Sequence, residues 1–179
     1  MSSRGRQSVS RQRIAVVHSR SFYLLVIVPC GSSKIWNVEP CHGPIQASEA
    51  YIGTPFKLNR RYAERFGDDW VVLSAKYGFI SPEFVIPGPY EVTFNRKSTN
   101  PVSHDVLRRQ VIDMQLHRFD VVVGLGGRAY RDALTTAFAD TPVRLEFPFA
   151  GLPIGRMLQA TRRALDSNHP GFDVITGEN

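Results

Sequence analysis

The sequence has no uninterrupted apolar run of about 18 residues, the length that a helix needs to cross a bilayer. It has only two cysteines, Cys30 and Cys41, too few for a disulfide scaffold in a chain of 179 residues. We also expect no signal peptide, because His18 and Arg20 interrupt the first apolar stretch and no small-residue cleavage site follows. These absences exclude a membrane-spanning protein and a disulfide-stapled secreted domain, and they favour the reducing cytoplasm.

Acidic residues are absent from residues 1–38, which carry six of the 22 lysines and arginines. The rest of the chain balances 16 basic against 16 acidic residues, so the formal net charge of +6 belongs to the N-terminal fifth. We expect residues 1–20 to be a flexible basic arm whose Arg11 and Arg13 contact DNA phosphates. A solvated tail that only aids solubility is the alternative.

The pattern of apolar residues predicts one α/β domain over residues 21–179, since hydrophobic residues make up 42% of the chain. Short apolar segments typical of buried parallel strands lie at 23–28, 70–73, 120–124 and 143–147. Helices are expected at about 55–66, 103–117, 126–138 and 153–165. We therefore predict a three-layer αβα fold with a central four-stranded, mostly parallel sheet. The more polar fourth strand should lie nearer an edge, and the proline-rich residues 81–100 should form an ordered surface loop.

In open α/β sheets the ligand lies beyond the carboxyl ends of the strands, so the loops that follow the strands should form the site. The first such loop consists of Gly31, Ser32, Ser33 and Lys34. Its small residues let a phosphate or sugar approach the backbone closely, and its hydroxyls and lysine could bind that group. It lacks the spacing of a P-loop, and a tight turn with an exposed lysine is the alternative. Arg128 follows two glycines at a helix start and could bind an anion, unless those glycines serve only close packing.

Aromatic and basic side chains of the first two loops could present flat faces and a cation to a nucleobase. They are Trp36, Lys76, Tyr77 and Phe79. Packing of the rings in the core is the alternative interpretation.

Residues 89–95 supply further candidates, because Glu91 lies between Tyr90 and Asn95 in the long loop. Its carboxylate could orient or deprotonate a water molecule, or it could be a solvated loop glutamate. Cys30 has no identifiable histidine partner as a nucleophile, and with Cys41 and His42 it makes an incomplete zinc set. We expect no metal at the site.

Four motifs resemble those of a family of bacterial and phage domains. They are C-G-x-S-K at 30–34, Y-x-G-x-x-F at 51–56, L-S-A-K-Y-G at 73–78 and P-Y-[DE] at 89–91. The pattern distantly resembles the YaaA peroxide-stress proteins, which are linked to DNA, and the lysine-transferring domain of archaeosine synthase. The expected architecture resembles the uracil-DNA-glycosylase superfamily. Similar proteins include anti-phage DNA glycosylases that remove hypermodified cytosine, such as glucosylated hydroxymethylcytosine, from viral DNA.

The resemblance implies a hydrolase of N-glycosidic bonds: a DNA glycosylase that flips and excises a modified base in antiviral defence, with DNA as its partner and no cofactor. Uracil glycosylases carry a water-positioning aspartate in the first loop, whereas residues 30–38 here contain no acid. The catalytic acid is then Glu91, or Glu49 as second choice, assisted by Lys34 and Ser33. Arg128 would hold a DNA phosphate together with Arg11 and Arg13. The residues that would bind the substrate are Cys30, Gly31, Ser32, Trp36, Lys76, Tyr77, Phe79, Tyr90 and Asn95. Two alternatives stay open: a nucleoside or nucleotide N-glycosidase or base-exchanging transferase, and a non-catalytic YaaA-like DNA-binding protein.

Overall fold

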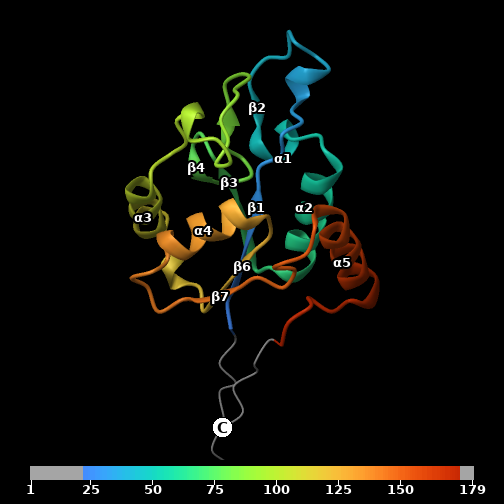
Figure 1. The fold of residues 1–179 in the computed structure, drawn as a ribbon, viewed down its shortest axis with the longest axis vertical. Helices are drawn as coiled ribbons and strands as arrows, with labels where there is room; N and C mark the ends of the chain where they lie inside the picture. Colours follow the sequence, from blue (N-terminus) through green and yellow to red (C-terminus); the bar gives the residue numbers. More distant parts are fainter. Residues whose placement is uncertain (1–21, 174–179) are drawn as a thin grey trace, which may run out of the picture.

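A computed structural model describes residues 22–173 of the chain. The strands of its central sheet are β1 (Leu24–Pro29), β3 (Asp69–Ser74), β4 (Gly78–Ile80), β6 (Val121–Gly124) and β7 (Arg144–Glu146). Its helices are α1 (Ala47–Ala50), α2 (Thr54–Phe66), α3 (His104–Asp113), α4 (Arg128–Ala137) and α5 (Ile154–Ser167). The sheet has the order β4-β3-β1-β6-β7, with β3, β1, β6 and β7 parallel and β4 antiparallel (Figure 1).

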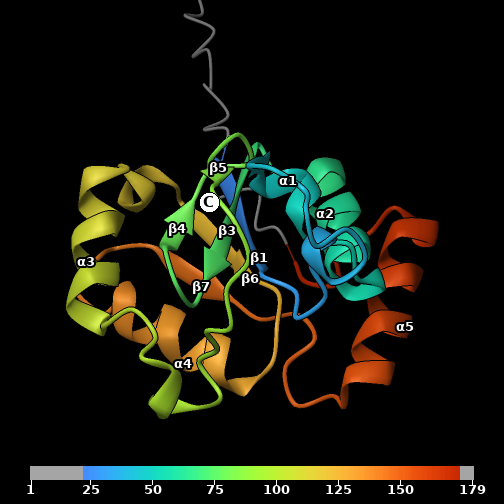
Figure 2. The same cartoon turned by 90° about the horizontal axis from the view of Figure 1, so that it is seen from above.

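Helices cover both faces of this sheet, with α2 and α5 on one side and α3 and α4 on the other (Figure 2). Successive side chains of a strand point to opposite faces, so the apolar run of β1 serves both helical layers. Leu24, Val26 and Val28 pack in the cluster that includes α2 and α5. Leu25 and Ile27 pack in the cluster of α3 and α4. The predicted three-layer αβα architecture is confirmed.

Local signals place the helix starts close to where the sequence predicts them. Pro55 lies in the first turn of α2, where its missing N–H costs nothing, and Gly67 follows the last residue. The Ser103 hydroxyl accepts a hydrogen bond from the Val106 N–H and caps α3. α3 is shorter than predicted, because the backbone turns left-handed at Gln115 (φ 59°) before a 3-10 turn.

The expectation of four strands is wrong, because the sheet has a fifth, β4, within a segment predicted as loop. Gly78 adopts φ +74°, a conformation open to glycine, and lets the chain reverse directly after β3. Phe79 and Ile80 then pair antiparallel with Leu73 and Val72. The new strand takes one edge of the sheet and β7 takes the other, so the predicted edge position of residues 143–147 is confirmed.

Residues 81–100 contain no α-helix, as predicted, but they are not all loop. They contain the short strand β5 (Val85–Ile86), which pairs with β2 (Ile45–Gln46), and a 3-10 turn at Lys97–Thr99. Across the described part of the chain, no helix has the length and apolar character needed to cross a membrane.

Candidate functional site

A pocket of about 590 Å³ opens where the parallel strands end. β1 connects through α2 to β3 on one side, and the chain then crosses to β6 on the other side of β1. The pocket lies at this switch point, since it is lined by the end of β1 and the turn that follows it (29–34) and by the residues that follow β6 (125–127). Ligands of open α/β sheets bind at this place, and pockets of about 300–1,000 Å³ suit small molecules and cofactors.

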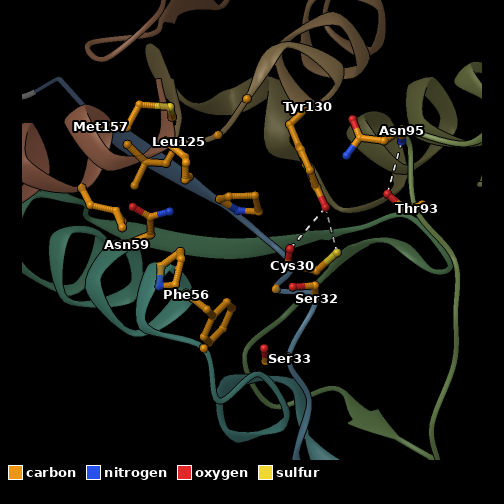
Figure 3. A pocket seen from close by; sticks show the side chains of 18 of the residues that line it. Cys30, Ser32, Ser33, Phe56, Asn59, Thr93, Asn95, Leu125, Tyr130 and Met157 are labelled. Carbon is orange, nitrogen blue, oxygen red and sulfur yellow. Dashed lines mark hydrogen bonds between the residues drawn. The ribbon is translucent and has the colours of Figure 1, made fainter. Parts of the chain in front are cut away.

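The pocket has an apolar part and a polar part (Figure 3). The apolar lining comes from α2, α5 and the segments that follow β6 and β7: Phe56, Leu125, Phe149, Met157 and Leu158. The polar lining comes from the turn after β1 and from residues 91–96. Such a division suits a ligand with one flat apolar portion and one charged or hydroxylated portion.

Backbone contacts fix the turn after β1. The Asn37 side-chain oxygen accepts from the Lys34 N–H at 2.6 Å, and the Ile52 N–H donates to the Ser33 carbonyl at 3.0 Å. The side chains of Ser32 and Ser33 are exposed in the pocket wall, and their hydroxyls make no hydrogen bond within residues 22–173. They are therefore free to bind a ligand.

Lys34 places a cation in this wall, although the residue is only 7% exposed. Its Nζ lies 4.4 Å from the centroid of the Tyr90 ring and donates a long hydrogen bond to the Ser32 carbonyl at 3.4 Å. Within the described residues no carboxylate forms an ion pair with it. Burying a charge is costly unless it is paired, so this ammonium is a ready partner for an anionic ligand.

Tyr90, predicted to bind substrate, is not part of the pocket lining; its ring lies against the Lys34 ammonium, and its hydroxyl is held by two contacts. Its Oη is 2.6 Å from Tyr51 Oη and 3.0 Å from Ser74 Oγ. Burial raises the pKa of both tyrosines well above the ordinary value, so both remain neutral phenols at physiological pH. The network thus presents a fixed ring face to the lysine.

A third tyrosine joins α4 to the end of β1. Tyr130 Oη lies 3.1 Å from Cys30 Sγ and donates to the Cys30 carbonyl at 3.2 Å (Figure 3). Burial, with a smaller effect of the Cys30 thiol, raises the pKa of Tyr130 above its ordinary range. The pair therefore joins α4 to the turn after β1 within the pocket lining, with Tyr130 as a neutral phenol.

Glu91 is the one acidic side chain that lines the pocket in the described part of the chain. It is exposed, and it forms neither an ion pair nor a side-chain hydrogen bond there. Its segment is ordered by Thr99, whose hydroxyl accepts from the Thr93 N–H at 3.0 Å and contacts the Arg96 carbonyl at 2.7 Å. A free carboxylate thus sits at the rim on a loop with fixed backbone.

Of the residues predicted from the sequence, seven line the pocket: Cys30, Gly31, Ser32, Ser33, Lys34, Glu91 and Asn95. Arg128 starts α4 directly after Gly127 of the lining, and its side chain is 88% exposed at the rim, 3.9 Å from Asp132. Glu49 is exposed on α1 and is not part of the lining. Arg11 and Arg13 lie outside the described residues.

The expected stacking surfaces need correction, because none of the four side chains lines the pocket. Trp36 is buried, and its Nε1 donates to the His42 carbonyl at 2.7 Å. Phe79 is buried in β4 on the other face of the sheet. Tyr77 packs edge-on against Tyr90, and Lys76 lies over both tyrosine rings. Aromatic side chains near strand ends often pack in the core, and this packing accounts for the positions of the three rings.

Sequence reasoning missed several lining residues, chiefly Asn59, Thr161 and Tyr130. Asn59 could have been found, since it is a polar residue on the apolar face of a helix, three positions after Phe56 and before Tyr62. Thr161 and Tyr130 carry no such signal. In the described ranges, no three histidine, cysteine or acidic side chains gather to hold a metal.

The fold and the pocket define a three-layer α/β protein with a pocket where its parallel strands end. The chain belongs to the family of unknown function DUF6884, which matches residues 25–163. It is 38% identical over 146 residues to the uncharacterized protein YfjM of Bacillus subtilis (strain 168), covering 81% of this chain and 97% of that protein. No solved structure matches the chain significantly.

Proposed function

We propose that this protein is a DNA glycosylase that takes a modified nucleobase into the pocket and hydrolyses its N-glycosidic bond, leaving an abasic site. In this proposal the fold is of the uracil-DNA-glycosylase type, and the base is a modified cytosine of phage DNA. The four sequence motifs support it, because three of them supply pocket residues: Lys34, Phe56 and Glu91. Motifs that are far apart along the chain thus contribute residues to one pocket.

One observation carries the proposal: among the residues that the structure describes, the pocket combines a buried cation that has no carboxylate partner with a single free carboxylate. Glycosidic cleavage builds positive charge on the sugar and negative charge on the departing base. Glu91 would stabilise the oxocarbenium-like sugar and accept a proton from the attacking water, whose oxygen bonds to the anomeric carbon. The bond electrons leave with the base, and Lys34 with Ser33 would stabilise that negative charge or hold the phosphate.

Flipping a base costs a few kcal/mol, which contacts to the DNA backbone must offset. Arg96 in the lining and Arg128 at the rim supply exposed cations beside the opening. Arg11 and Arg13 would add phosphate contacts from the basic arm. These cations favour DNA over a neutral small molecule.

A nucleotide N-glycosidase is the second candidate, favoured by the depth of Lys34. A cation that is 7% exposed in the pocket wall can hold the phosphate of a free nucleotide, whereas DNA phosphates are commonly held at the surface. DNA and mononucleotides offered as substrates to the same enzyme separate the two candidates.

The test is to incubate the protein with DNA that contains cytosine, hydroxymethylcytosine or glucosylated hydroxymethylcytosine, and with the matching mononucleotides. Released bases are measured by mass spectrometry and abasic sites by aldehyde labelling. We expect release from one modified DNA, and none from the Glu91→Gln variant. No release from any DNA would contradict the glycosylase, and release from mononucleotides alone would favour the second candidate.

The chemistry should be simple hydrolysis rather than a lyase reaction. A lyase forms a Schiff base between a lysine amine and the sugar. Lys76 lies outside the pocket lining, and Lys34 contacts an aromatic ring and a carbonyl, which suits an electrostatic role. Borohydride should therefore trap no covalent adduct between protein and DNA, and a trapped adduct would show a lyase.

A further inference from the structure

Asn59 is a largely buried residue whose side-chain amide has no hydrogen-bond partner among the residues that the structure describes. It is 8% exposed on α2 and lines the pocket. The pocket lining also contains Thr161 at 1% exposure, but that hydroxyl already donates to the Met157 carbonyl at 2.9 Å. Of these two buried polar side chains, Asn59 alone has its hydrogen-bonding groups available to a ligand.

The position is a poor one for asparagine if the residue serves only the fold. Asparagine in a helix interior is less favourable than leucine or alanine. Among the described residues only the Tyr77 hydroxyl is a fully buried side-chain polar group without a partner, so the Asn59 amide remains open to the pocket. Phe56, Tyr62 and Ala63 on the same helix are buried apolar residues, so leucine would continue their pattern. A ligand that pairs with the amide accounts for the residue.

The surroundings of Asn59 indicate the shape of that ligand. Figure 3 shows the amide on the same side of the pocket as Phe56, Leu125 and Met157, away from Thr93 and Asn95. An apolar chamber with one amide suits a flat ring that has polar atoms along one edge. The amide offers an acceptor and a donor side by side, which is the pairing that asparagine makes with the edge of a base.

We propose that Asn59 recognises a nucleobase in this apolar chamber through an edge on which a donor and an acceptor are adjacent. Cytosine supplies such an edge through its amino group and N3, and uracil supplies one through its N3–H and O4. The inference rests on the proposed function, because it places the flipped base at the inner end of that same pocket. Asn59 is a specificity-determining residue in this assignment. Glu91 and Lys34 remain the residues that act at the N-glycosidic bond.

Free bases test the subsite without DNA or turnover. Cytosine, uracil and pyrimidin-2-one, which lacks a substituent at the position of the cytosine amino group, are titrated into the full chain by NMR. We expect the wild type to bind cytosine or uracil at least about 10-fold more tightly than pyrimidin-2-one, the discrimination typical of a bidentate pair. Equal affinity for all three rings, or no binding up to their solubility limits, would overturn the assignment.

Substitution of the amide separates recognition from folding. Asn59→Leu should lose the preference among the three rings while its midpoint of thermal unfolding stays equal or rises. Gln159→Leu makes the same kind of change at an exposed site of α5 outside the lining and should keep the preference. If Asn59→Leu does not fold, Asn59→Ala decides the question: a lost preference supports the subsite, and a retained one refutes it.

The two proposals fail in different ways. Selective binding of a free base by a protein that releases no base from any DNA leaves the subsite standing and contradicts the glycosylase. If the wild type releases a base from DNA and Asn59→Ala releases the same base with the same preference, the glycosylase stands and the subsite is contradicted.

Discussion

The ammonium group of Lys34 lies 4.4 Å from the centre of the Tyr90 ring, and this aromatic face is its principal support in the pocket wall. Tyr90 is fixed in turn by Tyr51 and Ser74 through hydroxyl contacts of 2.6 and 3.0 Å. A ring face attracts a cation but does not neutralise it. The Tyr90 ring therefore holds the ammonium in place and leaves its charge available to an anion. The first prediction depends on this availability.

Lys34→Met should weaken binding of substrate DNA about 10-fold or more without loss of stability. Methionine keeps the unbranched stem and removes a buried charge that has no carboxylate partner in the described part of the chain. The free energy of unfolding should therefore stay equal or rise by about 1 kcal/mol. Urea denaturation and a DNA titration at fixed salt measure the two effects. Lys57→Met, at an exposed site of α2, is the matched control, and a large loss of stability in Lys34→Met alone would contradict the interpretation.

Glu91→Gln should lower base release about 100-fold or more, the scale on which positioned acid and base groups act. Glutamine keeps the size and most hydrogen bonding of glutamate but cannot stabilise positive charge on the sugar or take a proton from water. Folding and DNA affinity should be unchanged, as should the activity of Glu83→Gln at an exposed position in the same loop region. Full activity in Glu91→Gln would remove its assigned role and make Glu49 the next residue to test.

Deletion of residues 1–20 should weaken DNA binding and reduce its salt dependence. The slope of log affinity against log salt falls by about 0.9 for each phosphate contact that is lost from duplex DNA. Arg11 and Arg13 replaced together by alanine should reproduce part of the change while keeping the length of the arm. Titrations at several salt concentrations measure it, and an unchanged slope after deletion would show that the arm makes no phosphate contacts.

Alkaline pH should unfold the protein partly through Tyr130. Burial raises its pKa in the folded state above the ordinary value of 10.0, whereas the unfolded chain has that ordinary value. Below pH 10 both states keep the proton, and above it only the unfolded state loses the proton. The free energy of unfolding should then fall by about 1.4 kcal/mol per pH unit for each such tyrosine. Tyr130→Phe should reduce the slope of urea-denaturation stability between pH 10 and 11, and a slope equal to that of the wild type would contradict the assignment.

Local features of the sequence were sufficient for much of the fold. The continuous apolar run of β1 requires burial on both faces, which a parallel sheet between helical layers supplies. Pro55 and Ser103 mark helix starts by their own backbone and hydrogen-bonding preferences. β4 escaped prediction because three residues are too short to show a period, and its pairing depends on the reversal at Gly78.

The site divides in the same way. The turn after β1 and the acid at residue 91 were predictable, because glycine, hydroxyl, lysine and glutamate indicate polar chemistry wherever they fold. The sequence by itself thus determined the α/β class, the strand ends at which the pocket lies and the polar groups that line part of it. Only the tertiary structure decided that Trp36 and Phe79 are core while Asn59 faces the pocket, since each is placed by packing between segments distant in the chain. Whether a side chain is buried depends on the helices and strands that pack against it, and no local sequence pattern specifies that packing.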